Sequence, residues 1–147
     1  GPKVFSGYWR DDEATSRVIK NGWFYTGDIG RVDDEGYLYV EDRKKDLIVS
    51  GGENIATPEV ERVLYEHPDV IEAAVVGMPH SRWGEVPKAY VVLREGATAD
   101  ADGMRAFCRE RLAKFKVPAA IVFLPELPRT ASGKVLKREL RTAAGEE

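Results

Sequence analysis

From residue 44 onward, short apolar strand patterns alternate with amphipathic helix patterns, and this order limits the folds open to the chain. The order is a hairpin (44–55), a helix (57–67), two strands (70–78 and 88–95), a helix (103–115), a strand (119–127) and a short helix (135–141). We expect an α+β unit of about 100 residues, in which helices flank a small three-stranded sheet with the β-hairpin beside it.

The stretch before this unit has few partners of its own. A short helix is indicated at 11–19, and strand patterns at 22–32, broken by Gly27 and Asp28, and at 37–43 flank an acidic turn. A two-stranded ribbon is marginal in water because it buries little apolar surface. We therefore expect residues 1–43 to be the end of a larger N-terminal domain, and residues 44–147 to be a separate C-terminal domain.

The helix at 57–67 has the clearest start signal in the chain. Thr57 is expected to cap its N-terminus, and Pro58 suits the first helical position. Glu59 and Glu61 favour the positive end of the helix dipole. Val60, Val63 and Leu64 supply the apolar stripe that would face the sheet.

The formal charge of −3 hides an uneven distribution. Residues 1–103 hold 12 Lys and Arg against 20 Asp and Glu, a net of −8, whereas residues 104–141 hold 10 against 3, a net of +7. The basic end could face an anion such as a nucleotide phosphate, although charge alone favours a solvated helix face. Nucleic-acid binding is not expected, because aromatic residues are not interleaved with the basic ones.

Composition also narrows the chemistry and the compartment. Cys108 is the single cysteine, so no internal disulfide is possible and a reducing cytoplasm is expected. Its helical setting predicts a packed thiol rather than a nucleophile. Because the sequence contains only this cysteine and two histidines, no metal site is expected. No apolar run approaches the ~20 residues of a transmembrane helix, and the N-terminus has no signal-peptide core.

Three short stretches could carry function, but each has a simpler local explanation. Lys134 follows a Ser-Gly turn in "PRTASGKVLKREL", which does not match a phosphate-binding P-loop, and a surface lysine is the simpler alternative. Asp28 in "YTGDIGRV" could bind a sugar diol or form an Asx turn. Gly51 and Gly52 in "SGGENI" would allow close approach of another group to the backbone.

Taken together in this order, "YTGD", "DRKKDLIVSGGENIATPEVE" and "PRTASGKVLKREL" resemble the C-terminal motifs of the acyl-CoA synthetase family of adenylate-forming enzymes. The resemblance covers essentially the whole chain. It implies that residues 44–147 are the mobile C-terminal domain of such an enzyme. "SGGENI" followed by "PEVE" is similar to the CoA-ligase branch rather than to domains that load carrier proteins.

The resemblance implies roles in the first half-reaction. Lys134 matches the catalytic lysine that contacts the acyl carboxylate and the phosphates of ATP during adenylation. Asp28 and Arg43 match the residues that bind the ribose of ATP and AMP. Lys45 matches the hinge about which the C-terminal domain rotates between the two half-reactions.

It also implies a CoA-binding surface. The loop 50–54, with Gly51, Gly52 and Glu53, resembles the segment that lines the pantetheine tunnel. Trp83 matches a position that can contact CoA, although packing against the sheet is an equal alternative. Phe115 and Lys116 lie where relatives place residues near the CoA nucleotide.

The sequence thus predicts a fragment of an AMP-forming acyl-CoA ligase that activates a carboxylic acid. The expected acid is a fatty acid or a similar carboxylic acid. The parent enzyme would use ATP, CoA and Mg²⁺, and the fragment alone is expected to be inactive. Two alternatives remain at this point, a stand-alone nucleotide- or CoA-binding module and a carrier-protein-loading adenylation domain. The residues do not identify the acid, because its pocket would lie in the N-terminal domain.

Overall fold

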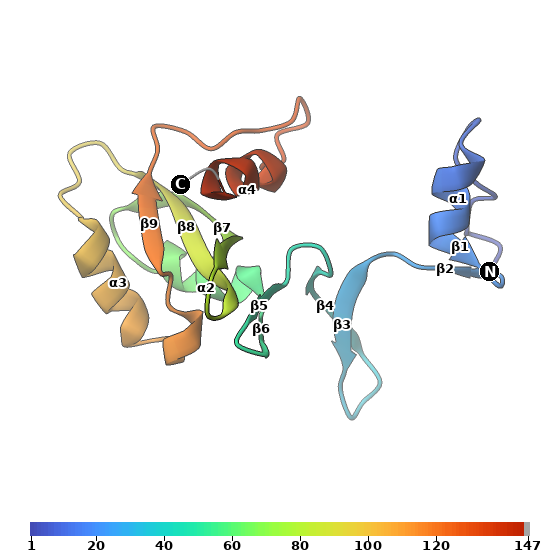
Figure 1. The fold of residues 1–147 in the computed structure, drawn as a ribbon, viewed down its shortest axis with the longest axis horizontal. Coiled ribbons are helices and arrows are strands. Elements are labelled where there is room, and N and C mark those ends of the chain that lie inside the picture. The colour runs from blue at the N-terminus through green and yellow to red at the C-terminus, as the bar shows by residue number, and fades with distance from the viewer. Residues whose placement is uncertain (146–147) are drawn as a thin grey trace. The chain divides into compact units, whose positions relative to one another are not determined.

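The structure is a computed structural model that describes residues 1–145, and it divides into two compact units (Figure 1). Unit 1 is Gly1–Lys45 and unit 2 is Asp46–Glu147. The assignment of residues 1–43 to a larger N-terminal domain remains a prediction.

Unit 1 consists of short elements joined by turns. Its elements are α1 (Asp12–Val18), β1 (Ile19–Lys20), β2 (Trp23–Phe24), β3 (Asp28–Val32) and β4 (Leu38–Arg43). The strands form two separate antiparallel pairs, β1 with β2 and β3 with β4. The predicted hairpin is therefore present, and the predicted break in 22–32 falls at residues 25–27, so that Asp28 is the first residue of β3.

Unit 2 is an α+β fold built on one sheet. Its elements are β5 (Ile48–Ser50), β6 (Glu53–Ile55), α2 (Thr57–Tyr65), β7 (Val70–His80), β8 (Gly84–Leu93), α3 (Ala101–Arg109), the 3₁₀ helix η1 (Lys114–Lys116), β9 (Ala120–Phe123) and α4 (Lys137–Gly145). The predicted three-stranded sheet is β7-β8-β9, in which β9 runs parallel to β8. The predicted hairpin, β5-β6, joins it where Ser50 pairs with Gly84, so the sheet has five strands.

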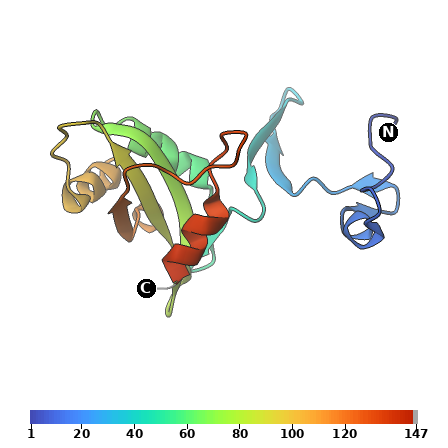
Figure 2. The ribbon, with the colours of Figure 1, turned by 90° about the horizontal axis from the view of Figure 1, so that it is seen from above.

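Helices cover both faces of this sheet, α4 on one and α2 with α3 on the other (Figures 1 and 2). Alternate side chains of a strand point to opposite faces. On β7, Ala73 and Val75 therefore pack with α2 and α3, while Ala74 and Val76 pack with α4. Short apolar residues suit this central position because helices lie close on both sides.

One expected helix cap and one expected helix end are wrong. The helix at 57–67 begins after Ala56, which has no side-chain cap bond, so Thr57 is the first helical residue and Pro58 the second. Thr57 is fully buried, and its Oγ1 instead accepts a hydrogen bond from Lys137 Nζ at 2.7 Å. The helix expected at 103–115 ends at Arg109, after which the chain forms η1.

The strands β7 and β8 are longer than the expected 70–78 and 88–95, and the loop between them is short. Pro79 and Pro87 fall between the two expected strands, and proline lacks the N–H that a strand ladder requires. Both lie within the paired strands instead, Pro79 opposite Glu85 and Pro87 opposite Gly77. Within residues 1–145, no helix is both long and apolar enough to cross a bilayer.

Candidate functional site

Lys134 lies on an exposed turn just before α4. Its N–H donates to Thr130 Oγ1 at 3.1 Å, and its carbonyl accepts from the N–H of Thr130 at 2.8 Å. Gly133 makes the turn possible with a φ of +86°, a conformation that costs little without a Cβ. No ion pair or side-chain hydrogen bond of Lys134 Nζ occurs among residues 1–145. The amine is thus a compact cation available to an anion outside the unit.

Asp28 and Arg43 face each other across the β3-β4 hairpin. They are paired in the strand register, and Asp28 Oδ1 lies 2.6 Å from Arg43 Nε. The carboxylate therefore forms an ion pair rather than the Asx turn considered above. Arg43 also lines a cavity of about 510 Å³ with Thr26, Gly27, Lys44 and Lys45. Lys45 is exposed and is the last residue of unit 1.

The glycine pair forms the two-residue turn between β5 and β6. Gly51 and Gly52 have φ values of +61° and +91°, the positive values that a tight hairpin of this kind requires. Gly51 donates its N–H to the carbonyl of Trp83 at 2.8 Å, and a Cβ on Gly51 would lie 2.9 Å from the Trp83 ring. Glycine at position 51 is therefore required twice, by its conformation and by the indole beside it.

This turn lies at the edge of an open cavity of about 510 Å³ in unit 2. Its lining residues are Ser50, Gly51, Glu53, Trp83, Val86, Pro87, Lys114, Phe115, Val117 and Ala119. The structure thus brings Trp83 and Phe115 to the same cavity as the glycine turn. Both residues are partly exposed, at 44% and 39%, so neither belongs to the core.

A second cavity, of about 490 Å³, was missed by sequence reasoning. Arg105, Arg109 and Lys114 line it together with four apolar residues. Arg105 Nε is buried and has no hydrogen-bond partner among the described residues. Since Lys114 lines both cavities, an elongated anionic molecule could contact both. The net charge of +7 over residues 104–141 indicated a basic region, but it did not identify which of its cations line the same cavity.

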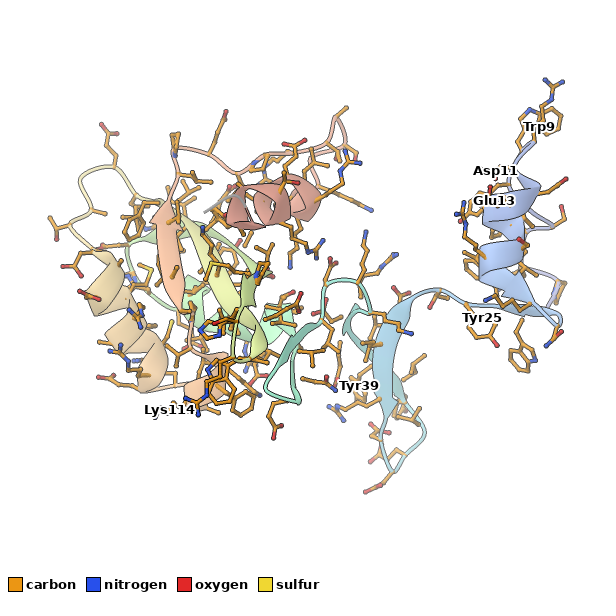
Figure 3. All side chains as sticks on the ribbon, in the orientation of Figure 1. Trp9, Asp11, Glu13, Tyr25, Tyr39 and Lys114 are labelled. Carbon is orange, nitrogen blue, oxygen red and sulfur yellow. The ribbon has the colours of Figure 1, made fainter. Side chains whose placement is uncertain are left out.

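The two lysines that flank Phe115 have different environments. Lys116 Nζ binds both carboxylate oxygens of Glu59, at 2.8 and 2.7 Å. Lys114 lines the cavities instead, and Figure 3 shows its position at the edge of unit 2. Of the two, Lys114 is therefore better placed than Lys116 to meet a ligand.

These surfaces can be compared with known proteins. The model of a family described as the AMP-binding enzyme C-terminal domain matches residues 59–134, about half of the chain. The chain belongs to the AMP-binding enzyme C-terminal domain family. Lys134 is the last residue of the matched segment, and Trp83 and Phe115 lie within it.

Curated relatives of this AMP-binding enzyme C-terminal domain are CoA ligases. The 2-succinylbenzoate–CoA ligase of Geobacillus kaustophilus is 58% identical over 141 residues, which cover 96% of this chain and 29% of the relative. The long-chain-fatty-acid–CoA ligase of Bacillus subtilis is 52% identical over 140 residues, which cover 95% and 25%. The chain therefore spans less than a third of the length of these relatives.

A solved structure agrees with this domain in fold. The o-succinylbenzoate CoA synthetase (MenE) from Bacillus subtilis, in complex with the acyl-adenylate intermediate OSB-AMP, matches with a TM-score of 0.86 and 48% identity. The match covers 96% of this chain and 29% of that one. The resemblance to acyl-CoA synthetases and the α+β fold expected from sequence are thus confirmed.

Other reactive groups of the domain have structural roles. Cys108 is buried between α3 and the sheet, and burial raises the pKa of its thiol to about 11, an effect that nearby Arg111 partly opposes. A thiol that stays protonated is a poor nucleophile. No group of three or more His, Cys, Asp and Glu residues able to hold a metal ion occurs within residues 1–145.

Proposed function

We propose that this chain is the C-terminal part of an ATP-dependent, AMP-forming acyl-CoA ligase. The observation that carries the proposal is Lys134, an exposed cation on a glycine-dependent turn that lacks an internal counter-ion in the described chain. Since the chain spans 29% or less of the named relatives, the remaining walls of the active site are proposed to belong to a larger N-terminal domain. Residues 1–43 would be the end of that domain, and the chain alone would be inactive.

In the first half-reaction a carboxylate attacks the α-phosphate of ATP, and pyrophosphate leaves. Two anions must approach each other, so a preorganised cation lowers the barrier. Lys134 is proposed to supply that cation. Arg43 and Asp28, which already face each other across the hairpin, are proposed to bind the ribose hydroxyls. The carboxylate accepts hydrogen bonds from hydroxyl groups, and the guanidinium donates them.

In the second half-reaction the thiol of CoA attacks the acyl-adenylate, and AMP leaves. Rotation about Lys45 is proposed to replace Lys134 at the active site by the turn at Gly51 and Gly52, where the absence of side chains leaves room for pantetheine. Glu53 and Trp83, on the cavity beside this turn, would contact the cofactor. The cations Arg105, Arg109 and Lys114 are proposed to bind its phosphates.

The acid substrate, the cell compartment and the role of Mg²⁺ are proposed only in general terms. The named relatives act on 2-succinylbenzoate and on long-chain fatty acids by their names, so a fatty acid is one proposal and an aromatic acid is another. The lone unpaired cysteine suits the cytoplasm. The Mg²⁺ that accompanies ATP finds no cluster of ligands in the described residues, and no role proposed for this chain involves it.

The experiment separates the half-reactions in the intact enzyme. Lys134→Ala should slow acyl-AMP formation by roughly 10²–10³-fold, because one preorganised charge is lost. Thioester formation from supplied acyl-AMP should stay within about twofold, because Lys134 would have left the site by then. Arg138→Ala is the matched control: Arg138 is an exposed cation on α4 without an ion pair among residues 1–145, and both rates should be unchanged. Equal loss in both half-reactions would refute the role of Lys134.

A further inference from the structure

Lys134 lies in a turn formed by residues 128–136. Arg129, near the start of this turn, connects it to the sheet. Arg129 reaches across the turn, and its Nη1 donates to the carbonyl of Gly133 at 2.6 Å. Its Nη2 lies 2.5 Å from Glu72 Oε1, on strand β7. One guanidinium thus connects the peptide group just before Lys134 to the central sheet.

The other hydrogen bonds of the turn determine its shape but do not attach its tip, residues 130–134, to the sheet; only at its C-terminal end does Val135 pack against the core cluster that includes Ala74 and Val76. Arg129 and Val135 form an isolated antiparallel bridge, and Leu136 donates its N–H to the carbonyl of Pro128 at 2.8 Å. The bonds between Thr130 and Lys134 close the loop. All of these join residues within the turn, so none of them holds its tip against the sheet.

The two ends of the turn are anchored more deeply. Leu127 before it is buried, and in α4 after it the carbonyl of Leu140 accepts a buried hydrogen bond from Tyr90 Oη at 3.0 Å. Lys137 Nζ also lies 2.7 Å from Glu61 Oε1. Between these anchors, the pair of Arg129 with Glu72 is the ion pair that joins the turn to the sheet in the described chain.

We propose that Arg129, held by Glu72, is a positioning residue for Lys134. The inference rests on the proposed function of Lys134. By fixing the carbonyl of Gly133, Arg129 fixes the backbone from which the lysine extends, and the amine reaches the reacting phosphate from one direction. Lysine has a flexible stem, so a variable backbone would spread its charge over many positions. Preorganisation of that charge is what accelerates the reaction.

Stability and catalysis should respond differently to loss of this arginine. The pair is partly exposed, with 40% of the Arg129 side chain and 29% of the Glu72 side chain accessible. Ion pairs of this kind contribute little to stability. A misplaced catalytic group, in contrast, can reduce a rate by up to roughly 10²-fold. A purely structural role would change stability and both half-reactions together.

The test uses Arg129→Met in the intact enzyme, which removes the guanidinium and keeps an extended side chain. We expect acyl-AMP formation to slow by roughly tenfold or more, and thioester formation from supplied acyl-AMP to stay within about twofold. Glu72→Gln should give a smaller loss in the same direction, because Arg129 keeps its bond to Gly133. The melting temperature of each variant should be close to that of the wild type, and the matched control Arg138→Met should change neither rate.

A double-mutant cycle with Lys134→Ala decides the outcome. If Arg129 acts through Lys134, then Arg129→Met should have no further effect in the Lys134→Ala enzyme. An equal loss in both backgrounds, or equal losses in the two half-reactions, would overturn the inference. If Lys134→Ala itself leaves adenylation intact, the proposed function fails. If only Lys134→Ala slows adenylation, the function stands and the role of Arg129 is rejected.

Discussion

Residues 1–45 and residues 46–145 both contain many large apolar side chains, but they use them differently. Unit 2 buries its apolar residues in two clusters on opposite faces of one sheet. Unit 1 has no buried residue; Trp9 is 86% exposed, Trp23 74% and Leu38 69%. Figure 3 shows the ring of Trp9 at the end of unit 1, away from α1. Apolar surface of this extent on a short segment is typical of a surface that packs on another part of a protein.

The two units therefore differ in how they can hold their site residues in place. Unit 2 has a core that can hold Lys134, the glycine turn and the cationic cavity in fixed positions relative to one another. Unit 1 holds Asp28 and Arg43 together by a hairpin and an ion pair, without a core of its own. Under the proposed function, the ribose site would therefore become rigid only when the larger domain covers unit 1.

The largest expected difference in stability comes from one leucine in each unit. Leu64→Ala should lower the free energy of unfolding by about 2–5 kcal/mol, because Leu64 is fully buried in α2 and leaves a cavity. Leu38→Ala, on exposed β4, should change it by less than about 0.5 kcal/mol. Urea unfolding of this chain, followed by circular dichroism, measures both. A comparable cost for Leu38→Ala would show that unit 1 has a core in solution, and the comparison would fail.

An ion pair from each unit gives a smaller difference. Lys137→Met should cost about 1–3 kcal/mol, because it removes the cation that pairs with Glu61 and the hydrogen bond that Lys137 donates to Thr57; the Lys137 and Glu61 side chains are only 20% and 18% exposed. The control is Arg31→Met, which breaks the 3.0 Å pair with Glu41 on the open hairpin and should cost less than about 1 kcal/mol. The same urea experiment compares them, and equal costs would contradict the burial argument.

The contact between Lys137 and Thr57 also shows where sequence reasoning stops. Thr57 precedes Pro58 and Glu59, which is the local pattern of a helix cap, and the helix was found there. The side chain is used elsewhere because Lys137, eighty positions away, approaches it in the folded unit. No local pattern contains that information. The periodicity that places Val60, Val63 and Leu64 on one face is local, and all three were predicted to be inside.

In the candidate site, too, some features could be predicted from the local sequence and others depend on the fold. The Ser-Gly turn and the glycine pair could be identified from sequence, because positive φ angles favour glycine wherever the turn lies. The resemblance pointed to Lys116 and did not include Lys114. The expected helix ran to residue 115, whereas α3 ends at Arg109 and Lys114 lies in η1, so the surroundings of the two lysines could not be read from the sequence. Arg105 and Arg109 were likewise visible only as part of a basic segment, until the fold placed them beside Lys114.

Two titrating groups give the finest comparison, because different forces shift their pKa values. In unit 1, the pKa of Asp33 is lowered mainly by the hydrogen bond from the backbone N–H of Tyr37, a local effect within a turn. In unit 2, burial raises the pKa of Cys108 from 9.0 to about 11. Burial therefore shifts the pKa of Cys108, and local hydrogen bonding shifts the pKa of Asp33.

The raised thiol pKa predicts a loss of stability at alkaline pH. Between pH 9 and about 11 the unfolded chain has released the Cys108 proton while the folded chain keeps it, so the free energy of unfolding falls as pH rises. By pH 10 the loss should be about 1 kcal/mol relative to pH 8. Lysines and tyrosines titrate in the same range, so the comparison is with Cys108→Ala, whose unfolding should lack this increment. If both proteins lose the same stability between pH 8 and 10, the thiol ionises in the folded state, and the core around α3 admits water that the structure excludes.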